Sequence, residues 1–270
     1  MSPADFELFA SLLKQRSGLS LTQEKEYLLQ SRLTPVARNH DLADLDALAA
    51  ELRNKRPEPL IREVVEAMTT NESFFFRDGQ PFEVFRKTVL PSLLDSRKDK
   101  RSMRIWSAAC STGQEPYSLA MILKDEAARL AGWRVEIIAT DLSSAVLQKA
   151  RAGMYSQFEV QRGLPIQMLM GYFQQIGEMW QIDAAIRGMV QFKEFNLLGD
   201  MSALGRFDVI FCRNVLIYFD QPTKAKVLAN MSAMVPDDGA LFLGAAETVL
   251  GLSQSFKPVP GQRGMYARAA

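Results

Sequence analysis

The 270-residue sequence has few of the residues that build metal centres and disulfide scaffolds. Its only histidine is His40, and its two cysteines, Cys110 and Cys212, stand in or beside the apolar runs IWSAAC and VIFC. This set excludes the usual zinc and haem sites, a Ser-His-Asp triad and a small disulfide-rich fold. We interpret both cysteines as buried free thiols and expect no metal.

The sequence also lacks a strong net charge, a targeting segment and a long apolar run. Its net charge of +1 does not favour nucleic-acid binding, which usually needs a visibly basic protein. The first residues, MSPADFELFASLLK, place acids where a signal peptide carries basic residues. No run reaches the ~18 apolar residues that a membrane span requires. We therefore predict a cytoplasmic protein.

Residues 1–70 carry helix signals and no convincing strand, which predicts a small all-helical N-terminal domain. Phe6, Phe9 and Leu13 recur at helical spacing in its first helix. The second helix contains Pro35, where we expect a kink or an early stop. The expected helices follow Ser2-Pro3, begin at Thr22, and cover 44–52 and 60–68.

From about residue 101, short apolar and β-rich runs alternate with helical stretches. Such alternation is typical of an α/β domain with a mainly parallel, doubly wound sheet. We interpret 71–100 as a linker and joining helix, and 153–188 as an insertion for which the sequence predicts no structure. The expected strands are 103–109, 134–140, 190–196, 207–212 and 240–246, with the last ones near Phe256 and at 264–269; the expected helices are 115–131, 143–151 and 222–234.

Doubly wound sheets bind ligands at the carboxyl ends of their strands, so the residues after each strand are candidates for a site. The first strand ends in SAACSTGQEPYSLA, where small residues and a helix N-terminus would let a ligand approach the backbone. Only Gly113 is present there, so the dinucleotide fingerprint G-x-G-x-x-G is absent. Asp141 ends the second strand, as a ligand for ribose hydroxyls, as the cap of the next helix, or as both through different atoms.

Two further segments hold polar residues that packing does not explain. The fourth strand ends in FCRNVLIYF, with Arg213, Asn214 and Tyr218 at an apolar strand end. The Asn/Asp-Pro-Pro-aromatic run of many base- and amine-modifying methyltransferases is missing there. The segment MTTNESFFFRD (68–78) has three phenylalanines, which we interpret as packing between the domains, followed by Arg77.

Together these blocks resemble the chemotaxis receptor methyltransferase (CheR) family over nearly the whole chain. The resemblance rests on TTNESFFFR (69–77), WSAACSTGQEPYSLA (106–120), ATDLS (139–143), FNLL (195–198) and FDVIFCRNVLIYFD (207–220). It implies a class I methyltransferase (Rossmann-like) domain with S-adenosylmethionine as methyl donor and S-adenosylhomocysteine as product. It also implies a cofactor pocket lined by Asn71, Ser73, Arg77, Glu115, Asp141, Asn196, Leu197, Arg213 and Asn214.

The reaction implied by the resemblance is the methylation of glutamate side chains on chemotaxis receptors for sensory adaptation. A glutamate has a pKa of roughly 4.3 and is already ionised at pH 7, so the enzyme needs no general base. Alignment and desolvation then supply most of the acceleration. Arg77 and Tyr218 resemble the family's residues that face the methyl donor and the incoming carboxylate.

The partner implied by the resemblance is the cytoplasmic helical bundle of the receptors, docked on basic residues of the second helix. Lys25 and Arg32 share a face of that helix, with Arg38 nearby, and a solvated helix face is the alternative interpretation. Some relatives also grip a receptor's C-terminal pentapeptide through a Gly-rich loop in the insertion. GYFQQIGEMWQIDAAIRGMVQF (171–192) lacks that loop, so we expect a pentapeptide-independent enzyme. As a separate expectation, we predict a monomer.

Three other functions stay open at this stage. A methyltransferase of small carboxylic acids would not need a separate helical domain. An adaptor that binds S-adenosylmethionine without turnover would not need Arg77, Asp141, Asn214 and Tyr218 intact. An NAD-dependent oxidoreductase is disfavoured by the missing glycine fingerprint.

Overall fold

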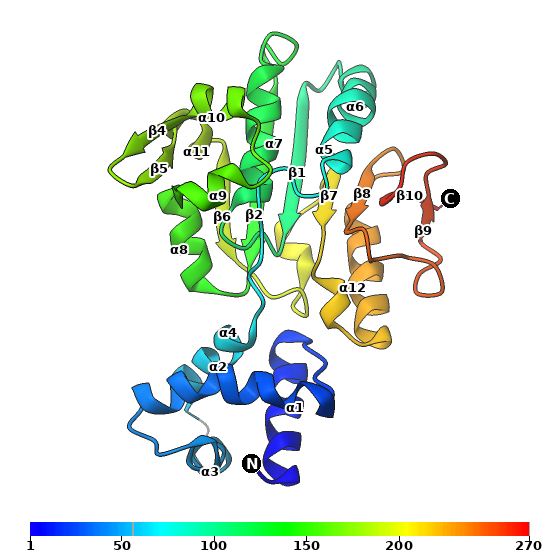
Figure 1. Ribbon diagram of the computed structural model, residues 1–270. Coiled ribbons are helices and arrows are strands. Elements are labelled where there is room, and N and C mark those ends of the chain that lie inside the picture. The colour runs from blue at the N-terminus through cyan, green and yellow to red at the C-terminus, as the bar shows by residue number, and fades with distance from the viewer. Residues whose placement is uncertain (56, 270) are drawn as a thin grey trace. The chain divides into compact units, whose positions relative to one another are not determined.

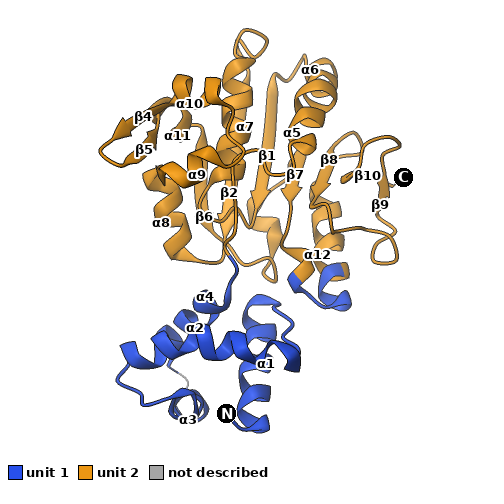
Figure 2. Ribbon diagram, viewed as in Figure 1, with its two compact units in different colours: residues 1–70, 218–224 blue, residues 71–217, 225–270 orange. Residues whose placement is uncertain are grey.

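The computed structural model describes residues 1–55 and 57–269, which form two compact units (Figures 1 and 2). The first unit consists of Met1–Thr70 with Tyr218–Lys224, and the second contains Asn71–Ile217 and the residues from Ala225 on. Within the described part of the chain, no helix combines the length and the apolar character that a membrane span requires.

The first unit is helical, as the sequence predicted. Ser2 and Asp5 form a capping box at the start of its first helix, which satisfies backbone groups that a helix end leaves open. The second helix continues through Pro35, so the early stop that we considered does not occur. The elements are α1 (Pro3–Ser17), the short 3-10 helix η1 (Gln23–Lys25), α2 (Glu26–Asn39), α3 (Leu45–Asn54) and α4 (Glu58–Met68).

The second unit is built on a seven-stranded sheet in the order β6-β2-β1-β7-β8-β10-β9 (Figure 1). The first five strands in that order are parallel, and β10 runs antiparallel to both β8 and β9. The chain order reverses between β1 and β7, which makes this the topological switch point of a doubly wound sheet. The strands are β1 (Ser102–Ala108), β2 (Arg134–Asp141), β6 (Val190–Glu194), β7 (Val209–Cys212), β8 (Ala240–Leu243), β9 (Phe256–Pro258) and β10 (Met265–Arg268).

Helices flank this sheet (Figure 1). Residues 71–100, which we interpreted as a linker and joining helix, are part of the second unit. The helix expected at 115–131 ends at Asp125, and turns closed by the carbonyl of Glu126 follow it. The helices are α5 (Gln80–Val84), the π-helical turn η2 (Phe85–Val89), α6 (Leu90–Ser96), α7 (Gln114–Asp125), α8 (Ser144–Ala152) and α12 (Gln221–Met234), with short 3-10 turns η3 (Met201–Leu204) and η4 (Leu216–Tyr218).

Phe75 is fully buried in the core of the second unit. Its ring makes edge contacts with Tyr155 and Phe173, with centroids 5.0 and 5.6 Å apart. Phe76 packs in the same way on Phe82, at 5.3 Å. We interpreted these phenylalanines as packing between the domains, but the contacts described here lie within one unit. Aromatic burial therefore fixes the segment that carries Arg77.

The insertion at 153–188 folds into a small lobe with a three-stranded antiparallel sheet in the order β3-β5-β4. Its hairpin joins β4 to β5 through the two residues Gly177 and Glu178. Gly163, in the same lobe, has a φ of +81°. The elements are β3 (Met154–Ser156), α9 (Gln157–Gln161), α10 (Ile166–Tyr172), β4 (Phe173–Ile176), β5 (Met179–Ile182) and α11 (Ala184–Arg187).

Gly163→Ala should destabilise the second unit strongly. A Cβ at this position would lie 2.1 Å from the carbonyl oxygen of Phe75, and the backbone is left-handed. Gly177→Ala is the matched control, because its φ is +61° but no atom lies within 4 Å of the added Cβ. In urea unfolding followed by circular dichroism, we expect a loss of about 1–2 kcal/mol for Gly177→Ala and a clearly larger loss for Gly163→Ala. Equal losses would contradict the close approach.

Candidate active site

The register of the sheet brings the ends of its parallel strands to one edge. Ala108 of β1 lies opposite Thr140 of β2 and Cys212 of β7, and Asp141 lies opposite Glu194 of β6. The residues that follow these strands must therefore share that edge, beside the switch point. They include the predicted cofactor residues Glu115, Asp141, Asn196, Leu197, Arg213 and Asn214.

The loop after β1 has an unusual backbone. Ala109, Ser111 and Gly113 all have positive φ, of 55°, 51° and 94°. A left-handed residue other than glycine costs roughly 1–2 kcal/mol, so the fold must hold Ala109 and Ser111 in place. α7 begins directly after Gly113, at Gln114. Strain of this kind concentrates at functional sites, which agrees with the small-residue turn singled out from the sequence.

Asp141 is one of the groups that hold this loop. Its Oδ2 accepts a hydrogen bond from the backbone N–H of Ser111 at 2.8 Å, and its Oδ1 accepts one from Ser143 at 3.0 Å. The N-cap of α8 is Ser143, whose side chain accepts from Val146. Capping therefore does not explain Asp141, which instead ties the loop after β1 to the end of β2.

Arg213 carries a buried charge beside the start of α7. Its side chain is only 1 % exposed, and its Nη1 donates to Oε2 of Glu115 at 3.0 Å. Its Nη2 donates to Oδ2 of Asp78 at 2.6 Å and to the carbonyl of Arg77 at 2.8 Å. The other oxygen of Glu115 accepts from the Ser107 hydroxyl at 2.8 Å. One guanidinium thus links β1, α7, β7 and the segment after Phe75.

Two forces oppose each other at Glu115. Burial raises the pKa of its carboxyl above the ordinary value, while the charge of Arg213 and the hydrogen bonds from Ser107 and Arg213 lower it. A buried carboxylate and a buried guanidinium are each costly alone, so each depends on the other.

Arg213 and Asn214 also hold unused hydrogen-bonding capacity. Among the buried side-chain atoms of residues 1–55 and 57–269, Nε of Arg213 and Oδ1 of Asn214 are two of those without a partner. Asn214 has a φ of +60°. Buried polar atoms nearly always have partners, so an open donor and an open acceptor on consecutive residues indicate a place for a polar ligand.

Arg77, Asn71 and Ser73 stand on the segment that precedes α5. The guanidinium of Arg77 donates to the carbonyl of Glu72 at 2.9 Å and lies over the Phe74 ring, 5.5 Å from its centroid. The carbonyl of Asn71 accepts from the Ser111 hydroxyl at 2.8 Å, which joins this segment to the loop after β1. Ser73 lies half-buried between them.

Asn196 and Leu197 follow β6 at the same edge. The N–H of Phe195 donates to the carbonyl of Asp141 at 2.9 Å, so this segment begins beside the end of β2. Oδ1 of Asn196 accepts from the N–H of Leu198 at 3.0 Å, and Leu197 is buried. The structure thus brings the predicted residues of the second unit together.

The remaining predicted residues belong to the first unit. Tyr218 accepts a hydrogen bond on its carbonyl from Ser20 at 2.8 Å. Arg32 is engaged within the unit, because its guanidinium donates to the carbonyls of Met68 and Thr69 at the end of α4 and to the Thr70 hydroxyl. By contrast, the exposed predicted docking residues are Lys25 and Arg38.

Sequence reasoning missed two residues of this edge, Asp78 and Glu247. Asp78 pairs with Arg213 at 2.6 Å, and Glu247 accepts the backbone N–H groups of Asn214 and Val215 at 2.8 and 2.9 Å. The sequence did carry one signal for Glu247, an acidic residue shortly after an apolar strand. Glu247 follows β8 in this way, much as Asp141 follows the apolar part of β2. Their partners, however, are distant in sequence, and the pattern of residues does not name them.

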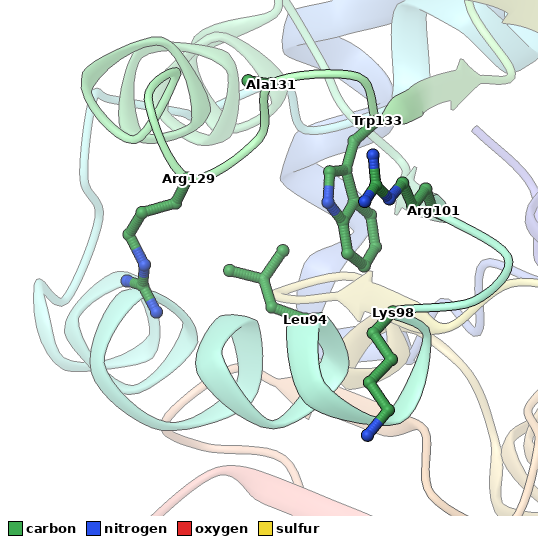
Figure 3. Close-up of a pocket in the computed structure, with 6 residues that line it drawn as sticks. All are labelled: Leu94, Lys98, Arg101, Arg129, Ala131 and Trp133. Carbon is green, nitrogen blue, oxygen red and sulfur yellow. The ribbon is translucent and has the colours of Figure 1, made fainter.

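A hollow of about 270 Å³ lies elsewhere in the second unit (Figure 3). The residues around it precede β1 or β2, so it belongs to the amino ends of these strands, away from the predicted residues. In Figure 3 the guanidinium of Arg101 lies beside the Trp133 ring. The lining residues are Leu94, Lys98, Arg101, Arg129, Ala131 and Trp133.

The sheet order, the switch point and the polar strand ends define the class I fold of S-adenosylmethionine-dependent methyltransferases. Family models then match both units: "CheR methyltransferase, all-alpha domain" at residues 4–69 and "CheR methyltransferase, SAM binding domain" at residues 71–265. The chain belongs to the CheR methyltransferase family.

Its relatives match it over almost its full length. It is 42 % identical over 270 residues to "Chemotaxis protein methyltransferase 1" of Pseudomonas aeruginosa, covering 98 % of each chain. It is 38 % identical over 269 residues to "Chemotaxis protein methyltransferase Cher2" of Pseudomonas putida, again covering 98 % of each. It is 33 % identical over 261 residues to "Chemotaxis protein methyltransferase" of Escherichia coli, covering 95 % of this chain and 88 % of the relative.

The mutual dependence of Arg213 and Glu115 is open to a double-mutant test. Arg213→Met should cost about 3–5 kcal/mol of unfolding free energy, because it leaves the Glu115 carboxylate buried without its partner. Adding Glu115→Gln should recover part of that loss. Because burial raises the pKa of Glu115, the deficit of the single variant should shrink as the pH falls and the carboxyl takes up a proton. Strictly additive losses in urea unfolding would contradict the coupling.

Proposed function

We propose that this protein transfers methyl groups from S-adenosylmethionine to glutamate side chains of chemotaxis receptors in the cytoplasm. The product is a protein glutamate methyl ester, which serves sensory adaptation. The observation that carries the proposal is the match of both units to CheR methyltransferase models. The relatives of the chain, which are named chemotaxis protein methyltransferases, support it.

The residues at the strand ends suit the cofactor. When bound, S-adenosylmethionine supplies an electrophilic methyl group on a sulfonium sulfur. Asp141, as a buried carboxylate after β2, suits ribose hydroxyls. Glu115 and the unpartnered Oδ1 of Asn214 are acceptors suited to an ammonium group, and Nε of Arg213 is a free donor.

Little acid–base equipment is needed for this reaction. The acceptor glutamate has a pKa of roughly 4.3, so it arrives ionised at pH 7 and no residue has to remove a proton. What remains is to orient the carboxylate and to exclude water from it. We assign orientation to Arg77, whose guanidinium is held in place by Phe74 and Glu72. From the family resemblance we also assign Tyr218 a role in the reaction. Arg77 would lose its charged partner once the neutral ester forms, which favours product release.

For receptor docking we propose exposed basic residues on the helical unit. Lys25 and Arg38 are exposed near the two ends of α2, whereas Arg32 already donates to three oxygens at the end of α4. We therefore assign docking mainly to Lys25 and Arg38, and a structural role to Arg32. Acidic receptor helices are the complementary surface.

Transfer of labelled methyl groups to receptor-containing membranes tests the proposed reaction. We expect label on receptor protein that is released by mild base, because methyl esters are base-labile. Base-stable label would point to amine methylation. Label in small acids alone would favour the small-molecule alternative, and cofactor binding without any transfer would favour an adaptor.

Arg77→Ala refines the same assay. We expect kcat/KM for the receptor to fall by about tenfold or more, the equivalent of a lost charge-assisted interaction. Arg162→Ala is the matched control, because the Arg162 guanidinium also lies over the Phe74 ring, 4.3 Å from its centroid. This substitution should change kcat/KM less than Arg77→Ala does. Full kcat/KM and normal cofactor affinity in Arg77→Ala would refute its assigned role.

We also propose that the enzyme does not depend on a receptor pentapeptide. The hairpin between β4 and β5 has only Gly177 and Glu178 at its turn, so it offers an acid and no basic residue to a peptide carboxylate. Receptors with and without a C-terminal pentapeptide should be methylated at equal rates. Calorimetry that detected micromolar binding of such a peptide would overturn this expectation.

A further inference from the structure

We propose that Glu247 is a positioning residue: it sets the backbone of Arg213 and Asn214 for cofactor binding without touching the cofactor. The inference rests on the proposed function only in taking S-adenosylmethionine as the cofactor at this edge. Its role follows from the backbone N–H groups of the segments after β7 and β8, which donate hydrogen bonds to the Glu247 carboxylate.

Both oxygens of Glu247 are occupied by backbone N–H groups. Oε2 accepts from Asn214 at 2.8 Å and from Gly244 at 2.6 Å. Oε1 accepts from Val215 at 2.9 Å and from Ile217 at 3.3 Å. The carboxylate is buried, with the residue 9 % exposed. Four donors on one buried anion make a strong, charge-assisted cluster.

These bonds replace the sheet ladder where β7 ends. Asn214 is left-handed, with a φ of +60°, so the chain turns sharply immediately after Arg213. Without Glu247, the N–H groups of Asn214, Val215 and Gly244 would lose the partners described for them, and buried donors without partners are costly. The carboxylate thus stabilises a left-handed turn, at an asparagine, one of the few residues besides glycine that adopt this conformation.

Gly244 shows how closely this cluster is packed. A Cβ at that position would lie 2.7 Å from Oε2 of Glu247 and 2.8 and 2.9 Å from Nδ2 and the backbone nitrogen of Asn214. The glycine therefore lets β8 bring its end against the turn after β7. The side-chain directions of Arg213 and Asn214, with the open Nε and Oδ1 atoms, depend on that turn.

A carboxylate suits this position better than an amide of the same size. Its two oxygens offer about four lone-pair sites for the four N–H donors. Glutamine has one oxygen and an NH₂ group that would face backbone donors. Glu247→Gln should therefore loosen the turn while preserving the side-chain volume.

The test is calorimetric titration of the full chain with S-adenosylhomocysteine, at a temperature where near-UV circular dichroism shows each variant folded. We expect Glu247→Gln to raise the Kd at least about tenfold and Glu247→Asp, which keeps both oxygens, to rescue part of the loss. The matched control is Glu159→Gln. Glu159 also accepts from a backbone N–H, that of Ser156 at 2.9 Å, in the small lobe. The Glu159→Gln variant should have a lower Tm and an unchanged Kd for S-adenosylhomocysteine.

A folded Glu247→Gln variant whose Kd lies within twofold of wild type would overturn the inference and reduce Glu247 to a stabilising role. If Glu247→Gln does not fold, Glu247→Asp decides. A Kd at least threefold weaker supports positioning, and an unchanged Kd overturns it. These results stand apart from the proposed function, because a wild-type protein that binds the cofactor but does not label receptors would refute only the latter.

Discussion

The buried ion pair between Arg213 and Glu115 is the interaction on which the rest of the site depends. A guanidinium that is 1 % exposed needs partners for its charge, and it finds them on two separate segments of the chain, at Arg77–Asp78 and at Glu115. Glu115 in turn reaches β1 through Ser107. Charge pairing therefore holds the segments at the switch point in place. The aromatic core of the sheet supports them, and in it Phe211 stacks on Phe242 with ring centroids 4.5 Å apart.

Two carboxylates at this edge hold the backbone of neighbouring segments in place. Asp141 accepts N–H groups from Ser111 and Ser143, and Glu247 accepts N–H groups on both of its oxygens. In each case the acid supports a neighbouring left-handed residue, Ser111 or Asn214. The fold thus uses buried negative charge to maintain two strained turns, and these turns shape the edge at which the cofactor is proposed to bind.

The parts of this arrangement that were predictable are those that local pattern controls. Apolar β-rich runs identified all the strands of the main sheet, and the strand ends identified Asp141 and Arg213. The sequence did not predict the small lobe, because its short strands, such as FQQI and MWQI, mix polar and apolar residues without a clear period. The sequence did not predict the roles of Asp78 and Glu247 either. Asp78 is 135 residues from its partner Arg213, and Glu247 is 33 residues from its partner Asn214, so only the tertiary fold reveals these contacts.

A site that presents an activated methyl group must also avoid methylating itself. Cys110 and Cys212 stand at the ends of β1 and β7, and a thiolate is a stronger nucleophile than a carboxylate. Burial raises the pKa of both thiols well above the ordinary value, and nearby acids, Asp141 for Cys110 and Glu247 for Cys212, raise it further. Both groups therefore stay protonated at neutral pH. The same buried carboxylates that hold the strained turns thus also disfavour ionisation of the two thiols.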